Sequence, residues 1–374
     1  MKDQNQAASA QAPAPFSCVY SPNVPELLQQ LGCSLALSTY QAGKLIFLSP
    51  AGTERLIQLP RTFKKPMGIA LEGDKLALAT LDEVIVLRSS SELAFHYPRN
   101  PGVYDALFMP RSAYYTGQID IHDLEWGTEG LYAVNTSFSC ICRINDAYSF
   151  EPFWQPPFIS KLAHEDRCHL NGMAMQAGKP AFATAFNTGD SRQSWRERIT
   201  QSGVLLNVDS GEIIAAELPM PHSPRLYDGK LYVLLSATGE LAHIDLASGQ
   251  RETVCKLDGF VRGMGRCGDY VFIALSRLRK NSSTFGKLPF EHRAQQAGVA
   301  IVHLPTGALA GSIRYQASVD EIYDLRVLPG LLRPNILSPQ QEEHKLGLSI
   351  PGTTYWGQPS NKSIDINNLE SDNT

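Results

Sequence analysis

A unit of four short predicted strands repeats along this chain, and the repeat constrains the fold more strongly than any other feature. The clearest copy starts at Pro66 and ends at Tyr97, with the strands PMGIA, KLALAT, VIVL and LAFHY joined by turns. Four further copies begin near Ile121, Leu170, His222 and Val261. The last turn of three copies ends in glycine, which supplies the positive φ that such hairpins need. Four antiparallel strands joined in this way are the unit of a β-propeller blade.

The two ends of the chain supply the parts of a sixth blade. Residues 321–328 (EIYDLRVL) look like an innermost strand with no partners behind it. Near the N-terminus, residues 34–40, 44–49 and 55–59 look like three strands that lack an innermost one. Joining them closes the ring and removes its open edge. The sequence therefore predicts an all-β, six-bladed β-propeller. A seven-bladed ring is the alternative, if residues 98–118 hide parts of two merged blades.

The domain boundaries follow from this repeat. Residues 1–23 read as a polar N-terminal tail, residues 24–338 as a single β-propeller domain, and residues 339–374 as a polar C-terminal tail. Helical periodicity is confined to residues 24–31, where VPELLQQL predicts a short helix with proline in its first turn. Hydrophobic residues make up 43% of the chain and charged residues 19%, which is ample material for a large core.

Charge and composition exclude several classes of partner. A formal net charge of -4 and a pI near 6.2 give no basic footprint for nucleic acid or for an anionic membrane. No segment approaches the roughly 18 apolar residues of a membrane span, and the N-terminus lacks the apolar core of a secretion signal. The seven cysteines are odd in number and scattered, which favours reduced thiols in the cytoplasm. The oligomeric state stays open.

Aligning the innermost strands places two sets of residues at equivalent positions near the axis. The first set is Met67, His122, Asn171, His222, Arg262 and Tyr323. The second set, two residues earlier, is Lys65, Asp120, His169, Met220, Phe260 and Glu321. The residue between them is apolar in every blade, and Cys168 falls outside both sets. Because side chains alternate along a strand, the two sets should share a face and form two stacked rings.

This alignment predicts a polar axial pocket that holds a small, anionic molecule or a metal. The candidate catalytic or ligand-binding residues are His122, His169, Asn171, His222, Arg225, Arg262, Glu321, Tyr323 and Asp123. The imidazoles of His122, His169 and His222 are the ligand type for a divalent transition metal. Without a metal they suit acid–base chemistry of a hydrolase, lyase or oxygenase type, with arginines holding an anion. The alternative is a channel lined by polar side chains that water alone bridges.

Two long loops are expected on the same face as the imidazoles. Residues 187–202 carry Arg192, Trp195 and Arg196, and residues 277–297 carry Arg277, Arg279 and Lys280. Long loops within a compact domain are usually functional lids or disordered segments. Their basic side chains could guide an acidic partner to the channel, so a protein- or glycan-binding module is the alternative function. Residues 98–118, rich in tyrosine, are a third candidate for this rim.

Common catalytic motifs are missing from the sequence. It contains no glycine-rich phosphate loop, no Gly-x-Ser-x-Gly elbow, no dinucleotide fingerprint and no His-Glu-x-x-His helix. Whether the chain is an enzyme therefore stays open.

Five motifs in fixed order resemble a known family. They are STYQAGK at residues 38–44, HDLEWG at 122–127, CHLNG at 168–172, PHSPR at 221–225 and SRLR at 276–279. In these motifs the chain resembles the bacterial family of uncharacterised proteins catalogued as TIGR03032, related to the DUF4915 domain. The resemblance covers roughly residues 33 to 338. It implies no activity and transfers no catalytic role to any residue.

Overall fold

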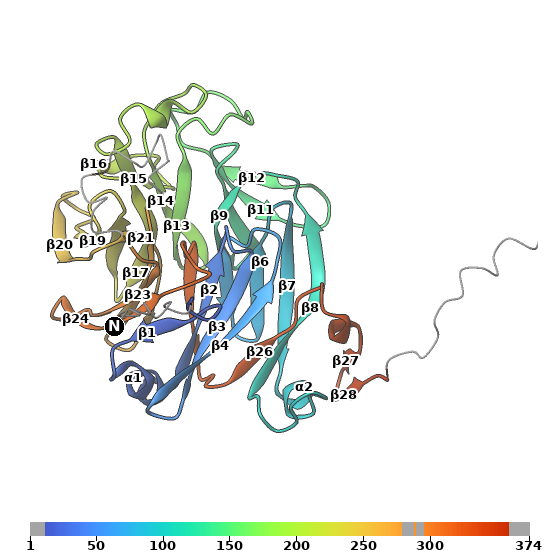
Figure 1. Ribbon diagram of the computed structural model, residues 1–374. Coiled ribbons are helices and arrows are strands. Elements are labelled where there is room, and N and C mark those ends of the chain that lie inside the picture. The colour runs from blue at the N-terminus through green and yellow to red at the C-terminus, as the bar shows by residue number, and fades with distance from the viewer. Residues whose placement is uncertain (1–11, 279–287, 289–294, 359–374) are drawn as a thin grey trace, which may run out of the picture.

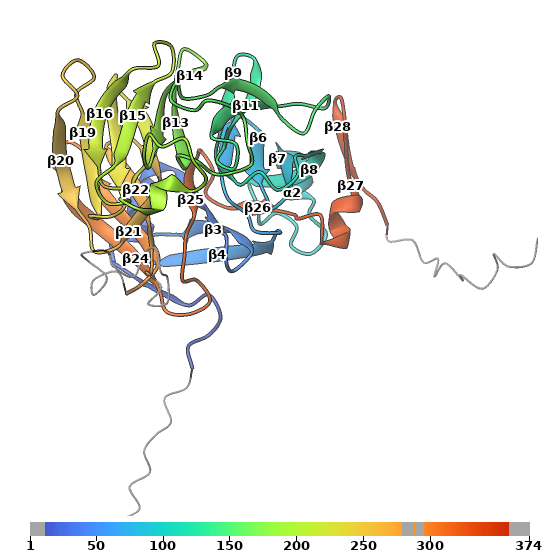
Figure 2. The ribbon, with the colours of Figure 1, turned by 90° about the horizontal axis from the view of Figure 1, so that it is seen from above.

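The computed structural model describes residues 12–278, 288 and 295–358. Its strands form six antiparallel four-stranded blades in a ring (Figures 1 and 2). Each innermost strand contacts the innermost strands of the blades before and after it. The six-bladed β-propeller predicted from the sequence is confirmed, and the seven-bladed alternative is wrong.

Five blades follow one another along the chain. Blade 1 contains β5 (Ile69–Glu72), β6 (Lys75–Ala79), β7 (Glu83–Ser90) and β8 (Ala106–Tyr115). Blade 2 contains β9 (Ile121–Gly127), β10 (Gly130–Asn135), β11 (Cys140–Ile144) and β12 (Glu151–Trp154). Blade 3 contains β13 (Leu170–Gln176), β14 (Lys179–Ala185), β15 (Gly203–Asn207) and β16 (Ile213–Leu218).

Blades 4 and 5 repeat the same pattern. Blade 4 contains β17 (Pro221–Tyr227), β18 (Lys230–Leu235), β19 (Glu240–Ile244) and β20 (Arg251–Lys256). Blade 5 contains β21 (Phe260–Cys267), β22 (Tyr270–Ser276), β23 (Gly298–His303) and β24 (Ala308–Tyr315).

Blade 6 closes the ring from both ends of the chain, as predicted. It contains β25 (Asp324–Pro329), β2 (Cys33–Thr39), β3 (Lys44–Ala51) and β4 (Arg55–Thr62). Strand β25 pairs antiparallel with β2, so that Ser38 lies opposite Asp324 and Cys33 opposite Pro329. The innermost strand of this blade thus comes from the C-terminal part of the chain and its three outer strands from the N-terminal part.

The predicted fourth strand of blade 1 is wrong. The segment LAFHY lies largely in helix α2 (Ser91–Phe95), which the side chain of Ser90 caps by accepting a hydrogen bond from the amide of Leu93. Strand β8 takes the fourth place instead, and Phe108 packs against Phe47 in the apolar core between blades 1 and 6. Because residues 106–115 form this outer strand, residues 98–118 are not a loop on the axial rim.

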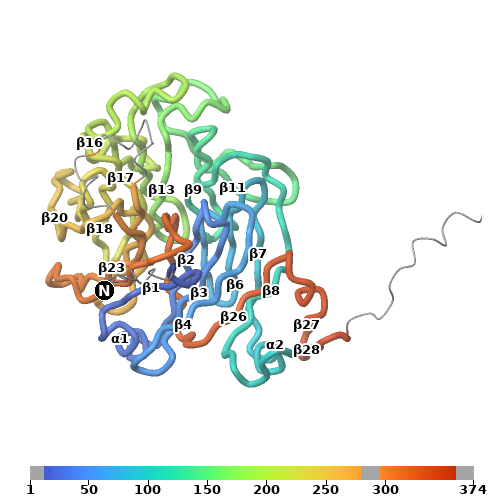
Figure 3. Tube along the Cα trace, in the orientation of Figure 1, coloured from blue at the N-terminus to red at the C-terminus, as the bar shows by residue number. Residues whose placement is uncertain are grey.

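Both segments expected as polar tails contain ordered elements (Figures 1 and 3). In the N-terminal segment, strand β1 (Cys18–Tyr20) adds a fifth strand to blade 5. Strand β26 (Pro334–Ile336), just before the C-terminal segment, pairs in parallel with β8 of blade 1. After the short helix η2 (Glu342–Lys345), strands β27 (Gly347–Ile350) and β28 (Thr353–Trp356) form a hairpin. The indole of Trp356 anchors the hairpin by donating a hydrogen bond to the carbonyl of Leu93 at 3.1 Å. The treatment of residues 24–338 as a single domain stays a prediction.

Helix α1 (Val24–Leu31) confirms the one helix that the sequence predicts, and Gly32 ends it in the left-handed conformation. Among the described parts of the chain, no helix is long and apolar enough to cross a membrane.

Hydroxyl side chains link neighbouring blades at the ends of their second strands. Each donates to a backbone carbonyl of the next blade: Ser38 to Met67, Thr136 to Leu170, Ser236 to Val261 and Ser276 to Ile322, at 2.6, 2.6, 2.6 and 3.1 Å. These bonds hold the start of the following innermost strand in place. The hydroxyls of Thr136 and Ser236 also form hydrogen bonds with two imidazoles, described below.

Candidate functional site

The chain enters four of the six innermost strands through a left-handed residue. Lys65, Asp120, His169 and Met220 have φ angles of 49°, 55°, 51° and 57°. Positive φ is uncommon outside glycine. All four belong to the second set of aligned residues, so their shared conformation supports the alignment of the blades made from the sequence.

Seven side chains from five blades form a closed ring of contacts around the axis, which we call the axial ring. Its members are Tyr323, His122, His169, Phe186, His222, Phe260 and Arg262. Successive aromatic centroids lie 5.4, 4.8, 4.5, 5.0 and 6.1 Å apart. The guanidinium of Arg262 completes the circle, 5.8 Å from the ring of Phe260 and 4.4 Å from that of Tyr323.

The axial ring brings the three predicted histidines together in a different arrangement from two stacked rings. The two aligned sets interdigitate, because His169 of one set contacts His122 of the other, and Phe260 contacts His222. Phe186, which the sequence did not single out, stands between His169 and His222.

The hydrogen bonds of the two most buried imidazoles define which nitrogen carries the proton. Nδ1 of His222 lies 2.6 Å from the hydroxyl of Ser236, and Nδ1 of His122 lies 2.8 Å from that of Thr136. Both hydroxyls already donate their single proton to a carbonyl of the next blade. They can therefore only accept from the imidazoles, so Nδ1 is protonated in both histidines and Nε2 carries a lone pair.

His169 follows the same pattern with a carboxylate. Its Nδ1 lies 3.1 Å from each oxygen of Asp166, which also accepts from the indole nitrogen of Trp195 at 2.9 Å. Nδ1 of His169 therefore donates a hydrogen bond to the carboxylate of Asp166.

Burial keeps the imidazoles of His122 and His222 neutral. It lowers the pKa of His122 to about 4, against the opposing effect of Asp120. Burial and the positive charge of Arg262 lower the pKa of His222 well below its usual value. At neutral pH both side chains thus present a lone pair rather than a positive charge.

Several polar atoms of this region have no hydrogen-bond partner among the described residues. They are Nε2 of His222, the amide nitrogen of Asn171, the hydroxyl of Tyr323 and Nε of Arg262. Asn171 uses only its oxygen, which accepts from Thr184 at 2.8 Å. Buried polar groups are nearly always paired, and an unpaired one costs about 1–3 kcal/mol. Four such atoms from four blades therefore point to a missing polar partner.

Arg262 and Glu321 form an ion pair at the same level. The guanidinium lies 3.2 Å from the carboxylate and covers the ring of Tyr323. Much of the charge of Arg262 is therefore balanced within the protein, which weakens the expectation that it serves chiefly to hold an anion.

Further along the innermost strands lies a buried network that we call the axial salt-bridge cluster. It contains Asp123, Glu125, Arg225, Asp324 and Arg326. Two guanidinium nitrogens of Arg225 donate hydrogen bonds to the carboxylate of Asp123, at 2.9 and 3.1 Å. Arg326 forms ion pairs with Asp123 at 3.1 Å and with Glu125 at 2.7 Å. Arg225 and Asp123 thus bind each other, and their predicted role as ligand-binding residues gains no support.

The axial salt-bridge cluster joins blades that are distant in the sequence. Asp123 also accepts from the amide of Met173 in blade 3, and Asp324 accepts from the amide of Ile69 in blade 1. Three carboxylates face two guanidiniums, so one negative charge is uncompensated when all are ionised. Burial raises the pKa of Glu125 and of Asp324, while the arginines oppose this shift.

The first long loop lies against the axial ring. Trp195, in the short helix η1 (Ser194–Arg196), packs on the imidazole of His169 with ring centroids 4.3 Å apart. An apolar cluster continues from Trp195 and includes two members of the axial ring; it is formed by Phe186, Trp195, Ile199, Met220, Ala237, Phe260, Leu278 and Leu288. Apolar side chains from both long loops thus cover this side of the axial ring.

The basic residues of the two loops face outward where they are described. Arg192 is exposed, and the exposed Arg196 covers the ring of Trp195 at 4.3 Å. Arg277 lies 3.5 Å from Asp320. Arg279 and Lys280 lie outside the described residues. The role of this set in partner binding stays a prediction.

The three residues that precede His169 each have a different environment. Arg167 binds Glu165 and Asp190, at 2.8 and 2.6 Å, and Asp166 binds His169 and Trp195 instead of its neighbour. Cys168 lies in the apolar core of blades 2 and 3, where burial raises its pKa to about 12. Such a thiol is no nucleophile at neutral pH.

The three-histidine metal site receives no support from the geometry. Across residues 12–278, 288 and 295–358, no three His, Cys, Asp or Glu side chains are arranged to hold one ion. Phe186 separates His222 from His169. The metal site stays a prediction.

Sequence reasoning missed the residues that pair across blades. Glu125, Asp324 and Arg326 stand inside the innermost strands, in IHDLEW and EIYDLRVL, where charge is unexpected in a buried strand. Thr136 and Ser236 stand at the ends of second strands, as do Ser38 in SLALST and Ser276 in FIALS. This recurring terminal Ser or Thr is a sequence signal for the hydrogen bonds between blades.

Comparison with known proteins gives a family and distant structural matches. No curated protein sequence matches the chain. Among solved structures, a chain of the nidogen/laminin complex is 11% identical with a TM-score of 0.49, covering 80% of this chain and 99% of that one. A protein of unknown function from Bacteroides caccae is 9% identical with a TM-score of 0.48, covering 79% and 98%. The Pan2 WD40 domain of Neurospora crassa is 10% identical with a TM-score of 0.36, covering 65% and 64%.

The family match spans most of the propeller. Residues 22–337 match the family described as "Domain of unknown function (DUF4915)", a range that runs from just before helix α1 to just past strand β26. It includes all six blades and every described member of the axial ring. The chain therefore belongs to the DUF4915 family.

Proposed function

We propose that the axial ring binds a small polar organic molecule through Nε2 of His222. The observation that carries this proposal is the state of that nitrogen: it is buried, it carries a lone pair, and it has no partner among the described residues. His222 itself is only 2% exposed. A hydroxyl or amide group of a ligand would supply the missing donor.

The neighbouring atoms indicate the rest of the ligand. The amide nitrogen of Asn171, the hydroxyl of Tyr323 and Nε of Arg262 are buried donors without a partner among the described residues. They call for a carbonyl or carboxylate oxygen on the ligand. The faces of Phe186 and Phe260 offer apolar contact beside His222. A small hydroxy acid or hydroxy ketone combines these features, and of the two the hydroxy acid retains the expectation of an anionic molecule.

The same arrangement suits proton abstraction. A neutral imidazole whose Nδ1 proton is held by Ser236 or Thr136 presents a lone pair at Nε2 that can accept a proton, and its lowered pKa makes it a weak base until a ligand compensates for the burial. The hydroxyl of Tyr323 and the guanidinium of Arg262, 4.4 Å from the tyrosine ring, would stabilise negative charge that develops on a bound oxygen. The enzymatic version of the proposal is therefore removal of a proton from a hydroxyl-bearing substrate.

Two substitutions of His222 separate ligand binding from structure. His222→Asn keeps a donor for Ser236 and removes Nε2, whereas His222→Gln removes the donor near Ser236 and keeps a polar atom near Nε2. His96→Phe, at an exposed histidine outside the ring, is the matched control. The probes are glycolate, lactate, hydroxyacetone, glucose, inorganic phosphate and zinc chloride, each tested by thermal shift.

At about 100 times its dissociation constant, a true ligand stabilises the protein by roughly 2.7 kcal/mol. We expect a hydroxy acid or hydroxy ketone to do so in the wild type and in His96→Phe, and the effect to vanish in His222→Asn. The proposal fails if no organic probe stabilises the wild type, or if His222→Asn responds as the wild type does. A response to zinc alone would favour the metal site instead.

A further inference from the structure

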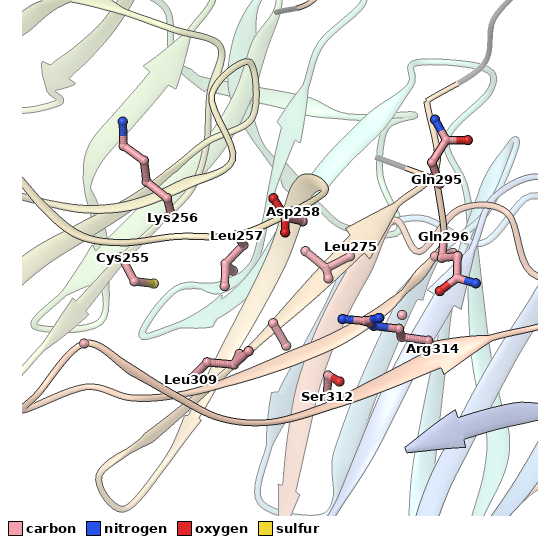
Figure 4. A pocket seen from close by; sticks show the side chains of 14 residues that line it. Cys255, Lys256, Leu257, Asp258, Leu275, Gln295, Gln296, Leu309, Ser312 and Arg314 are labelled. Carbon is pink, nitrogen blue, oxygen red and sulfur yellow. The ribbon is translucent and has the colours of Figure 1, made fainter. Parts of the chain in front are cut away.

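A cavity of about 380 Å³ opens between blades 4 and 5, away from the axial ring (Figure 4). Its volume lies in the lower part of the range of small-molecule pockets, roughly 300–1,000 Å³. A second cavity of about 420 Å³ lies between the same blades, lined by Tyr227, His243, Arg266 and other polar residues. No member of the axial ring lines either one.

The first cavity exists because blade 5 presents small residues to blade 4. Gly298 lies opposite Arg314, and Ala300 lies opposite Ser312, on the pair of strands β23 and β24. A Cβ atom on Gly298 would overlap the carbonyl oxygen of Ile313, so a larger residue cannot fill the space there. A β-bulge between Ile301 and Val302 brings Leu309 onto the same face.

Three leucines form an apolar part of the cavity wall, beside the polar residues Asp258, Gln295, Gln296 and Ser312. Leu257 after β20, Leu275 of β22 and Leu309 of β24 face one another across it. Cys255 contributes a thiol whose pKa burial raises to about 11, so the lining offers no reactive nucleophile at neutral pH. The three leucines suit an apolar group held without a covalent bond.

One cation at the rim, Arg314, has no charge partner among the residues that the structure describes. The guanidinium of Arg314 is directed over the cavity (Figure 4), and it makes no hydrogen bond or ion pair within the described ranges. The other basic residue of the lining, Lys256, is already 3.2 Å from Glu240. Arg314 is therefore the group available to a ligand, and a guanidinium binds a carboxylate with two parallel hydrogen bonds.

We infer that this cavity binds a small carboxylate with an apolar chain or ring. The carboxylate pairs with Arg314 at the rim, and the apolar part lies between Leu257, Leu275 and Leu309. This site is separate from the axial ring and does not depend on the function proposed there.

The test uses hexanoate and three matched compounds: 1-hexanol without charge, hexylamine with the opposite charge, and acetate without the chain. Binding to the full chain is measured by saturation-transfer NMR titration. Arg314→Gln removes the cation at an exposed position, and Leu309→Asp places a negative charge in the apolar wall. Arg55→Gln, at an exposed arginine of blade 6, is the control.

We expect hexanoate to bind with a dissociation constant of about 1 mM or below, and Arg314→Gln to weaken it at least about tenfold. Leu309→Asp should weaken it similarly, while Arg55→Gln and His222→Asn leave it unchanged. Equal binding of hexanoate and hexylamine would overturn the inference. So would unchanged affinity in Arg314→Gln, or the absence of hexanoate binding at about 10 mM.

Discussion

Replacing Arg225 by methionine tests the axial salt-bridge cluster. The side chain makes two hydrogen bonds to Asp123, at 2.9 and 3.1 Å, and lies 3.6 Å from Glu125. Without it, three buried carboxylates share Arg326 alone. Removing one partner of a buried ion pair costs about 3–5 kcal/mol, because the remaining charge stays buried and uncompensated. We therefore expect Arg225→Met to lower the free energy of unfolding by about 3–5 kcal/mol at about pH 7.5.

The loss should shrink as the pH falls. Burial already raises the pKa of Glu125 and of Asp324 above the value in an unfolded chain. A carboxyl group with a raised folded pKa stabilises the fold below its unfolded pKa, and that contribution is lost as the pH rises through the folded pKa. Removing Arg225 raises these pKa values further. The variant should thus recover part of its stability between about pH 7.5 and pH 5.

Urea unfolding, monitored by circular dichroism, measures both the loss of unfolding free energy and its change with pH. Arg88→Met removes an exposed ion pair with Asp74 and should cost less than about 1 kcal/mol. Adding Asp123→Asn to Arg225→Met restores the charge balance of the cluster and should recover part of the loss. A cost below about 1 kcal/mol for Arg225→Met, or a cost that does not change with pH, would refute the reasoning.

Two further predictions concern the imidazoles and the C-terminal hairpin. Because the pKa of His122 is about 4 in the fold and about 6.5 when unfolded, the protein should lose up to about 3 kcal/mol as the pH falls between these values. His122→Gln should flatten this dependence in urea unfolding, and an unflattened curve would contradict the assignment. Trp356→Ala should expose the amides of residues 347–356 to rapid hydrogen exchange, because an isolated hairpin is marginal. Tyr355→Ala, at a side chain 54% exposed, should leave their protection intact, and equal effects would contradict the anchoring role.

The ring of blades could be predicted because its signals are local and repeated. Each hairpin carries alternating apolar residues and a turn, and the unpaired pieces at the two ends of the chain required one closing blade. The error at LAFHY arose because a short apolar run does not distinguish a strand from a buried helix. The helix is stabilised by the Ser90 side chain, which caps it, and by the burial of Leu93 and Ala94.

The axial positions were predictable, but their partners were not. Strand alignment identified His122, His169 and His222, since equivalent positions in a propeller converge on the axis. It could not show that Arg225 binds Asp123, 102 residues earlier, or that Phe186 separates two imidazoles. Such pairings depend on the angle between blades and on side-chain length, which no local pattern encodes.

Ligand binding in the axial ring requires a neutral His222 with its proton on Nδ1 and a lone pair on Nε2. Nitrogen-15 NMR of the imidazole rings at about pH 7 measures this directly, with the His222 signals assigned from their loss in His222→Asn. We expect a protonated Nδ1 and a non-protonated Nε2, whose signal shifts when a hydroxy acid or hydroxy ketone binds. A protonated Nε2, or a doubly protonated ring at that pH, would contradict this expectation.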